Sequence, residues 1–248
     1  MTENKKSNIV TPKAQEQMQP KKRNKWLLPA LLAGCLIFPL IHNLPTNRTQ
    51  NNGIELSKLS HGVKAKYIKQ LPDTTCATSY DLPYLTEEEL FSANETTIIK
   101  GVVSSIQNIQ LDFHGEKLYW AIAKVKVQKV YRGNCKVDDT ITLRLQCSIN
   151  DDVYVEDTET ISSMKKGMTG IFMPIQYDDT SDYSENDATL HLKDIADYGF
   201  LDGVRYAFLD SDNGLIFDKT SYKSIENAKT LDDIEQYVLK MTGSKYKK

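Results

Sequence analysis

The amino-acid sequence predicts a mainly β (α+β) fold, a small OB-like twisted barrel with peripheral helices, preceded by one transmembrane helix. Three observations lead to this expectation. A long apolar run follows a basic N-terminal segment. Beyond it, several stretches alternate between apolar and polar residues and are rich in β-branched side chains, which is typical of strands. Helix N-cap signatures mark two segments, fewer than the strand-like stretches, so we expect strands to dominate the fold.

Residues 1–25 form a basic tail. Seven Lys and Arg side chains face two Glu side chains there, a net charge of +5, whereas the whole chain carries −2, so residues 26–248 carry −7. The tail has two prolines and no apolar period, which predicts a disordered cytoplasmic segment. Nucleic acid is excluded as a partner of the acidic remainder, because phosphate binding needs clustered positive charge.

The apolar run over residues 26–44 predicts a transmembrane signal anchor. Its nineteen residues would reach about 28 Å as a helix, close to the ~30 Å hydrocarbon core of a bilayer. Lysine and arginine residues crowd its N-terminal side, which places that end in the cytoplasm. We therefore expect a single-pass protein of the plasma membrane whose C-terminal domain is extracytoplasmic.

Two other interpretations of this run remain open. The residues Leu32-Ala33-Gly34-Cys35 resemble a lipobox, in which Cys35 would be the site of lipidation. A cleaved secretory signal needs small residues at a cleavage site, and residues 42–45 do not offer a convincing one. Each alternative still leaves the rest of the chain outside the membrane.

Residues 45–75 are polar near the membrane and predict a linker, so we expect the folded domain over residues 76–243. Thr86 followed by Glu89 has the form of a capping box and predicts a short helix that ends near Asn94.

Four segments predict the strands of the barrel: residues 96–103, 118–131, 140–147 and 167–175. The second segment alternates strictly until its apolar phase breaks, which indicates a β-bulge near Lys129. The third segment predicts one apolar face, formed by Ile141, Leu143, Leu145 and Cys147, with Thr140, Thr142, Arg144 and Gln146 opposite.

The C-terminal third predicts a loop, a hairpin and a helix. Residues 176–188 are acidic without an apolar period and predict a mobile loop. Strands over residues 204–209 and 214–217 flank Asp212-Asn213-Gly214, a hairpin turn signal. Thr230 then predicts the N-cap of a helix that Gly243 ends.

The order of residues 97–103, 123–133, 139–143 and 166–175 resembles extracytoplasmic OB-like barrels of the netrin-module and tissue-inhibitor-of-metalloproteinase type, including uncharacterised membrane-tethered versions in Gram-positive bacteria. The resemblance covers roughly residues 76–175. It implies a five-stranded barrel that binds partners rather than a chemistry. The inhibitors act through a free N-terminal cysteine, and Cys76 is internal here, so that activity does not carry over unless the chain is cut before it.

Three cysteines, Cys76, Cys135 and Cys147, lie beyond the anchor, where oxidation is possible. A bond between Cys135 and Cys147 is disfavoured. The ~3.3 Å rise per strand residue separates them by more than about 20 Å, whereas a disulfide needs Cα atoms within about 7 Å. The resemblance implies a disulfide between Cys76 and Cys147, with Cys135 free.

No motif predicts a catalytic residue, a cofactor site or a metal site. The histidines have no metal-ligand spacing, so we expect solvent-exposed side chains at His42, His61, His114 and His191. The acidic run over residues 210–214 favours a hairpin turn over a calcium loop.

The sequence thus favours a membrane-anchored extracytoplasmic binding or interaction module with an unknown ligand. Its expected partners are the plasma membrane, through residues 26–44, and another envelope protein or a small ligand. The alternatives are an envelope enzyme, which is less favoured, a protease-inhibitor-like protein, and a structural cell-envelope lipoprotein.

Overall fold

The computed structural model of the chain describes residues 52–72, 82–150 and 156–243. The predicted cytoplasmic tail and the predicted anchor over residues 26–44 lie outside these ranges, as do Cys35, His42 and Cys76. Within the described ranges, no helix has the length and apolar character needed to cross a membrane.

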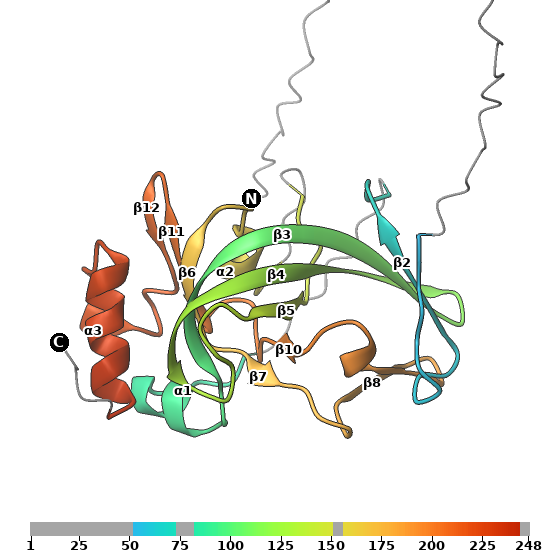
Figure 1. Cartoon of the computed structure of the whole chain (residues 1–248), viewed down its shortest axis with the longest axis horizontal. Coiled ribbons are helices and arrows are strands. Elements are labelled where there is room, and N and C mark those ends of the chain that lie inside the picture. The colour runs from blue at the N-terminus through green and yellow to red at the C-terminus, as the bar shows by residue number, and fades with distance from the viewer. Residues whose placement is uncertain (1–51, 73–81, 151–155, 244–248) are drawn as a thin grey trace, which may run out of the picture. The chain divides into compact units, whose positions relative to one another are not determined.

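The described part of the chain is mainly β, as predicted, with few helices (Figure 1). Its larger sheet contains β1 (Gly53–Ile54), β2 (Val63–Ile68), β3 (Ile98–Phe113), β4 (Glu116–Arg132), β5 (Thr140–Leu145), β6 (Thr169–Phe172), β7 (Ile175–Gln176), β10 (Tyr198–Gly199), β11 (Ala207–Ser211) and β12 (Gly214–Ile216). The path of paired strands is β12-β11-β6-β3-β4-β5-β10-β7, and β2 joins β1 to β3. A separate hairpin consists of β8 (Asp182–Glu185) and β9 (Ala188–His191).

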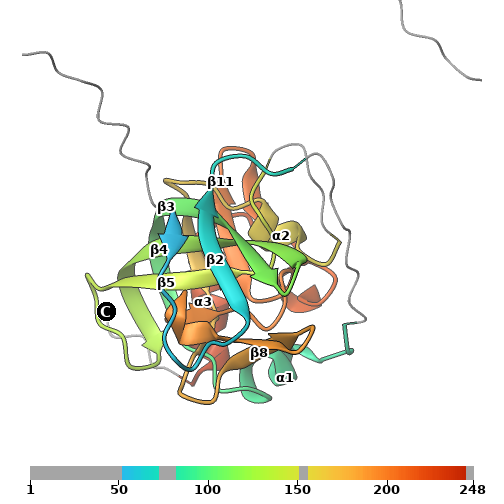
Figure 2. The same ribbon diagram turned by 90° about the vertical axis from the view of Figure 1, so that its right-hand side faces the viewer.

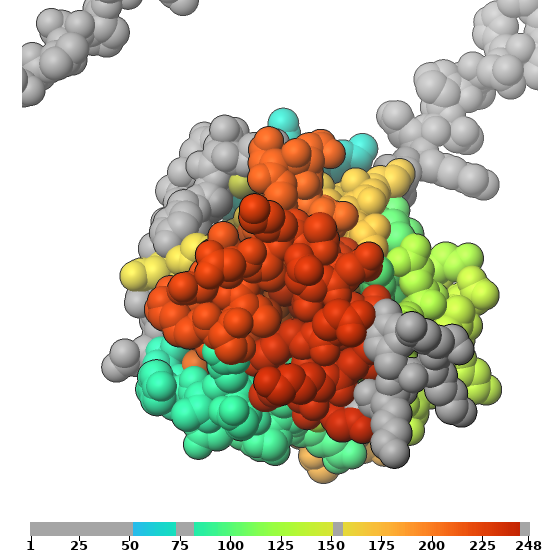
Figure 3. Space-filling view, turned by 90° about the vertical axis from the view of Figure 1, so that its left-hand side faces the viewer, coloured from blue at the N-terminus to red at the C-terminus, as the bar shows by residue number. Residues whose placement is uncertain are grey.

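The helices are short and peripheral. They are α1 (Glu87–Ser92), α2 (Glu159–Ser162), α3 (Leu231–Met241) and the 3-10 turns η1 (Leu192–Asp194) and η2 (Lys223–Ile225). Both predicted N-caps are confirmed: Thr86 and Thr230 each accept a hydrogen bond from a backbone N–H three residues later within a capping box. Figure 3 shows α3 covering one end of the domain, beside α1 and the β11–β12 hairpin.

The β3–β4 hairpin forms the curved spine of the sheet. Its turn uses His114 and Gly115, both at positive φ (51° and 101°), as a type I′ connection requires. The pairing register shifts at three places along the two strands. One shift lies between the pairs Lys100–Lys129 and Gly101–Val127, which confirms the predicted bulge near Lys129. Because bulges bend strands and increase their twist, the hairpin curls (Figure 1).

The curl brings the start of β3 back beside β7. Strand β10 pairs parallel with β5 and antiparallel with β7. Strand β7 follows β6 after two residues, and β6 pairs with β3. An isolated bridge joins Thr96 to Ile175, and the Thr97 N–H donates to the Pro174 carbonyl at 2.7 Å. The strand path from β6 through β3, β4, β5 and β10 therefore returns to the segment where it began.

Two apolar clusters lie on opposite sides of this curled sheet. Alternation along β4 sends Ala121, Ala123 and Val125 into the larger cluster, which α3 also contacts. The side chains of Trp120 and Ile122 join the second cluster, on the outer side of β4. The β8–β9 hairpin and β2 cover this outer side, and both lie toward the viewer in Figure 2.

The expected start of the domain at residue 76 is too late. Residues 53–54 and 63–68, assigned to the linker from sequence, form β1 and β2, and β2 pairs with residues 108–113 of β3. The short strand exposes Lys64 and Lys66 and buries Ala65, so its apolar signal is weak.

The expected loop over residues 176–188 was also wrong. It contains β8, which pairs with β9 through a tight turn at Asn186 and Asp187, both at positive φ. The strand reads Asp-Tyr-Ser-Glu, and a single partly buried tyrosine cannot produce a period-2 apolar pattern.

Candidate functional site

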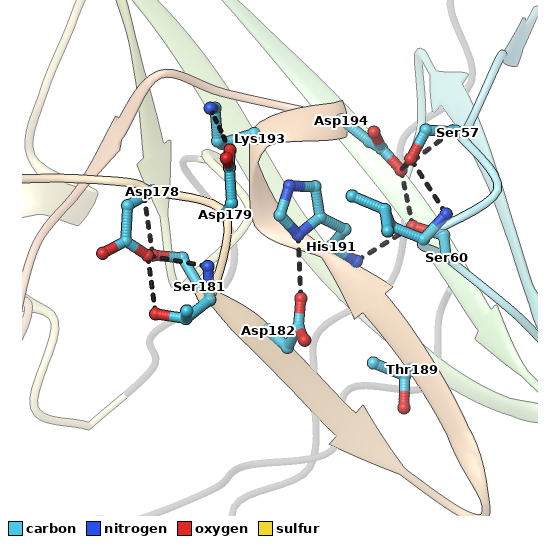
Figure 4. Close-up of polar contacts among 12 residues, drawn as sticks. Ser57, Ser60, Asp178, Asp179, Ser181, Asp182, Thr189, His191, Lys193 and Asp194 are labelled. Carbon is cyan, nitrogen blue, oxygen red and sulfur yellow. Dashed lines mark hydrogen bonds and ion pairs between the residues drawn. The ribbon is translucent and has the colours of Figure 1, made fainter.

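Two groups of polar side chains lie on the outer side of the sheet, and the first surrounds His191 on β9. The His191 Nδ1 atom lies 2.8 Å from Asp182 Oδ1 across the β8–β9 hairpin (Figure 4). The side chain is buried, so the expectation of an exposed histidine was wrong here. The reason is that β8 was not recognised from sequence, and β8 supplies the carboxylate that pairs with the imidazole.

A serine and a second aspartate complete this group without forming a catalytic triad. The Ser60 hydroxyl donates to Asp194 Oδ2 at 2.6 Å and accepts the backbone N–H of His191 at 2.9 Å (Figure 4). A nucleophilic serine needs its hydroxyl on the imidazole of the base, and this hydroxyl contacts the histidine backbone instead. The group therefore fastens the segment around Ser60 to β9, as the bridge between His61 and Thr189 also does.

The other described histidines are exposed, as predicted. His61 lies on the segment before β2, and His114 occupies the β3–β4 turn with its Nδ1 atom 3.1 Å from the Asn186 carbonyl oxygen. Within residues 52–72, 82–150 and 156–243, no three His, Cys, Asp or Glu side chains come close enough together to hold a metal ion.

The two described cysteines are free thiols. Cys147 is buried on the inner face of the sheet, as its strand pattern predicted. Burial raises the pKa of its thiol to about 11, although a hydrogen bond with Thr158 opposes this shift. The thiol is therefore protonated at neutral pH and a poor nucleophile. The structure shows no disulfide at Cys147, and the predicted partner Cys76 lies outside the described residues.

The second polar group lines a cavity of about 340 Å³ on the outer side of β4 and β5. Its walls come from both strands, from β8 and from the segments at residues 157–158 and 201–203. The side chains that give the cavity its shape and chemistry include Leu82, Trp120, Arg144, Gln146, Tyr183 and Leu201.

Arg144 is the central group of this cavity. Only 9% of the residue is exposed, and its Cζ atom lies 4.6 Å from the centroid of the Trp120 ring and 5.9 Å from that of Tyr177. Its Nε donates to the Tyr177 hydroxyl at 2.6 Å. Among the described residues, no acceptor bonds its two terminal nitrogens and no carboxylate pairs with it. The terminal nitrogens are not among the fully buried atoms, so they reach the surface of the cavity. A largely buried cation without a carboxylate partner among the described residues is the unusual feature of the site.

Gln146, two residues after Arg144, has a side-chain atom without a hydrogen-bond partner among the described residues. Its Nε2 donates to the Phe200 carbonyl oxygen at 2.7 Å. Its Oε1 is buried and accepts no hydrogen bond from the described part of the chain. Because alternate residues share one face of a strand, this acceptor and the Arg144 guanidinium face the same side of the sheet at the end of β5.

The aromatic frame around Arg144 is tightly fixed. The Trp120 ring meets Tyr183 edge-on, with centroids 5.0 Å apart and planes at 79°. Tyr177 is buried, which raises the pKa of its hydroxyl while Arg144 opposes the shift. A Cβ atom at Gly199 would lie 1.8 Å from the Tyr177 hydroxyl oxygen, so only glycine at this position of β10 leaves room for the tyrosine.

Two carboxylates also line the cavity. Asp202 is saturated: it forms an ion pair with Arg205 at 2.8 Å and accepts the backbone N–H groups of Val204 and Arg205. Asp157 lies on the wall with a positive φ of 60°. The cavity thus combines an aromatic wall with a guanidinium and an amide oxygen whose remaining hydrogen-bonding capacity is not used by the described residues, which is a set of groups suited to binding.

Arg144 and Gln146 lie on the face of the strand opposite the core, as predicted. The sequence pattern did not identify them as a site. A polar face ordinarily points to water. Here the β8–β9 hairpin covers that face, and this hairpin was missed. The signal available in the sequence was the pair Arg144 and Gln146, two positions apart on one strand, together with Trp120 on the preceding strand.

No family model, curated protein or solved structure matches this chain. The resemblance to netrin-type barrels therefore stays a prediction.

Proposed function

We propose that this chain is a membrane-anchored extracytoplasmic binding module whose ligand site is the cavity lined by Trp120 and Arg144. The observation that carries the proposal is the largely buried Arg144 side chain, which lines the cavity and whose terminal N–H groups have no acceptor in the described part of the chain. Folded proteins seldom leave a buried charge unpaired, and binding sites are where such groups find their partner in a ligand.

The strand pairing supports an OB-like barrel as the scaffold. Counting from β3, the ring of strands is β3, β4, β5, β10 and the β6–β7 segment, with a parallel contact between β5 and β10. OB folds are five-stranded, partly open barrels that bind their ligands on the face of the second and third strands. In this ring those strands are β4 and β5, which carry Trp120 and Arg144.

The charge pattern supports the location. The basic segment before residue 26 and the apolar run over residues 26–44 favour a signal anchor whose N-terminal end is cytoplasmic. The domain then faces the outside and meets ligands that the cell surface presents. Protease added to intact protoplasts should digest the domain and leave a short anchored fragment, and a protected domain of full size would contradict this orientation.

The binding function can be tested with the full chain in lipid nanodiscs. The sequence contains two tryptophans, Trp26 and Trp120, so a Trp26→Phe variant leaves Trp120 as the fluorescent reporter inside the cavity. We expect members of a panel of small acids, amides, amino acids and sugars to change its emission, and Arg144→Gln to abolish the response. If no compound of the panel changes the emission, the cavity is not a ligand site and the proposal fails.

A matched control removes a positive charge on β4 without touching the cavity. Lys126 is exposed and pairs with Asp138 at 3.1 Å. Lys126→Gln should leave the response of Trp120 unchanged. Loss of binding in this variant as well would show that the general charge of the domain, rather than the guanidinium in the cavity, attracts the ligand.

A further inference from the structure

We infer that the cavity takes an α-amino acid unit, meaning a carboxylate with an N–H group on the adjacent carbon atom. The inference rests on the proposed binding function and specifies its ligand. Three observations support it: the terminal donors of Arg144 and the Oε1 acceptor of Gln146, which have no partner among the described residues, and the size and apolar wall of the cavity.

The guanidinium defines the carboxylate end of the ligand. The Arg144 Nε donates a hydrogen bond to the Tyr177 hydroxyl, so the two terminal nitrogens are the donors that a ligand can use. Parallel N–H donors in one plane match the two oxygens of a carboxylate. Trp120 lies against the guanidinium, with its ring centroid 4.6 Å from Cζ, and the Tyr177 bond fixes the rotation of the side chain, so the donors are held in place before a ligand arrives.

The glutamine defines the other end. An amide oxygen only accepts hydrogen bonds, and donation of Gln146 Nε2 to the Phe200 carbonyl identifies the other end of the amide as that oxygen. Oε1 is buried at the edge of the cavity without a partner among the described residues, and a rotation of the side chain would present it to a ligand. The Cα atoms of Gln146 and Arg144 are two positions apart, about 6.6 Å along the strand direction. A ligand that satisfies both residues must carry a donor close to its carboxylate. An α-amino acid unit has that spacing, whether its nitrogen is free or acylated.

The size and the apolar wall of the cavity narrow the ligand further. Because a water molecule occupies about 30 Å³ of liquid, a cavity of about 340 Å³ holds roughly eleven water-sized groups, which suits an N-acetylated amino acid. Leu82 and Leu201 give the cavity an apolar wall for an aliphatic side chain.

The experiment compares matched probes on the full-length Trp26→Phe chain in nanodiscs. N-acetyl-leucine presents both groups, N-acetyl-leucine amide lacks the carboxylate, and 2-acetoxy-4-methylpentanoate has an oxygen atom in place of the N–H. We expect N-acetyl-leucine to bind most tightly. Removing the carboxylate should weaken binding about 10- to 100-fold, because hydrogen bonds to charged groups contribute about 1.5–3 kcal/mol. Removing the N–H should weaken it about 2- to 10-fold, as for a neutral hydrogen bond.

Variants assign each group to its residue. Arg144→Gln should remove the preference for N-acetyl-leucine over its amide. Gln146→Met should remove the preference over 2-acetoxy-4-methylpentanoate. Arg144→Lys keeps the charge but loses the fork, so it should retain weak binding without discrimination, and it serves if Arg144→Gln fails to fold. A Gln146→Met variant with undiminished preference for the N–H would overturn the assignment.

Further probes separate the sources of the ligand and the two levels of the proposal. Free leucine, N-acetyl-leucine and glycyl-leucine distinguish a free amino acid, an acylated one and a peptide C-terminus, which all share the inferred chemistry. Binding of neutral sugars or inorganic phosphate in place of these probes, lost in Arg144→Gln, would overturn the ligand class while leaving the binding function standing. If no probe of any class changes Trp120 emission, the binding function itself fails.

Discussion

The inner and outer faces of β4 and β5 follow the same alternation of side chains, but one face is apolar and the other carries buried polar groups. On the inner face, small and aliphatic side chains such as Ala121, Ala123 and Leu143 are fully buried in the larger cluster. On the outer face, Trp120 and Arg144 are nearly as buried, yet Arg144 keeps donors that no acceptor in the described chain uses. The inner face is packed with apolar side chains, whereas the outer face holds polar groups without partners among the described residues.

This difference separates stability from binding on adjacent residues of one strand. Residues on the inner face contribute through packing, because their burial leaves nothing polar unsatisfied. Residues on the outer face hold groups whose burial costs free energy until a partner arrives. Substitutions on the two faces should therefore have opposite profiles, large effects on unfolding on one side and large effects on binding on the other.

The largest expected effect on stability comes from the inner face. Leu143 is fully buried, and Leu143→Ala should lower the free energy of unfolding by about 2–5 kcal/mol, since it removes apolar contacts and leaves a cavity. Urea denaturation followed by circular dichroism measures the change. The folded fraction of the variant should still bind N-acetyl-leucine. A selective loss of binding with unchanged stability would break the proposed division between the faces.

A smaller effect on stability, joined to an effect on binding, is expected at Gly199. In Gly199→Ala the new methyl group would meet the Tyr177 hydroxyl. Displacing the tyrosine should cost about 1–3 kcal/mol of unfolding free energy, as overpacking does in cores. It should also weaken ligand binding, because Tyr177 orients Arg144.

A double variant tests this explanation. Tyr177→Phe removes the hydroxyl that the methyl group would strike, so Gly199→Ala should cost less in a Tyr177→Phe background than in the wild type. The coupling is measured by urea denaturation of the four proteins in the cycle. Strictly additive costs would show that the hydroxyl is not the group that sets the cost, which would leave the ring carbon Cζ, 2.5 Å from the Cβ position, as the decisive contact.

The inner face was far more predictable from sequence than the outer one. Apolar alternation around Val125 and Leu143, the bulge near Lys129 and both capped helices follow from local patterns, because each depends on side chains within a few positions of one another. The β11–β12 hairpin was predicted from its Asp-Asn-Gly turn for the same reason.

The outer face depends on segments that carry weak local signals. Strand β2 has small or alternating apolar residues between lysines, and β8 has one tyrosine between polar residues, so neither shows a clear strand period. Their positions are set by pairing with β3 and β9, which are distant or unrecognised in sequence. Without these covering segments, Arg144 and His191 are expected to be exposed, and the cavity cannot be foreseen.

A still smaller effect on stability is expected when the cation of the outer face is removed. Arg144→Met keeps a long side chain against Trp120 but removes the buried charge. The lost cation–π contact and the relieved desolvation oppose each other, so the free energy of unfolding should stay within about 1 kcal/mol of wild type. Binding of N-acetyl-leucine should nevertheless disappear. A loss of stability as large as that of Leu143→Ala would mean that Arg144 is a structural residue rather than a ligand group.

The smallest expected effect depends on pH and concerns the edge of the outer face, where Ser60 fastens its segment to β9. Burial opposes ionisation of Asp194, but hydrogen bonds from Ser60 and Ser57 outweigh it and hold the pKa of this carboxyl below its ordinary value. A carboxyl with a lowered pKa stabilises the fold above its unfolded-state pKa, and this contribution is lost as pH falls through the folded-state pKa.

Ser60→Ala removes one of these hydrogen bonds, so it should destabilise the domain at neutral pH, and the difference from wild type should shrink as pH falls below about 3.9, the usual aspartate value. Ser184→Ala is the matched control, because the Ser184 hydroxyl bonds the Thr189 hydroxyl at 2.9 Å, a group that does not titrate in this range. Its effect should not change over the same pH range. Urea denaturation at a series of pH values measures both. A pH-independent cost for Ser60→Ala would show that the serine acts through the His191 backbone rather than through Asp194, and that this edge of the outer face is held without charge.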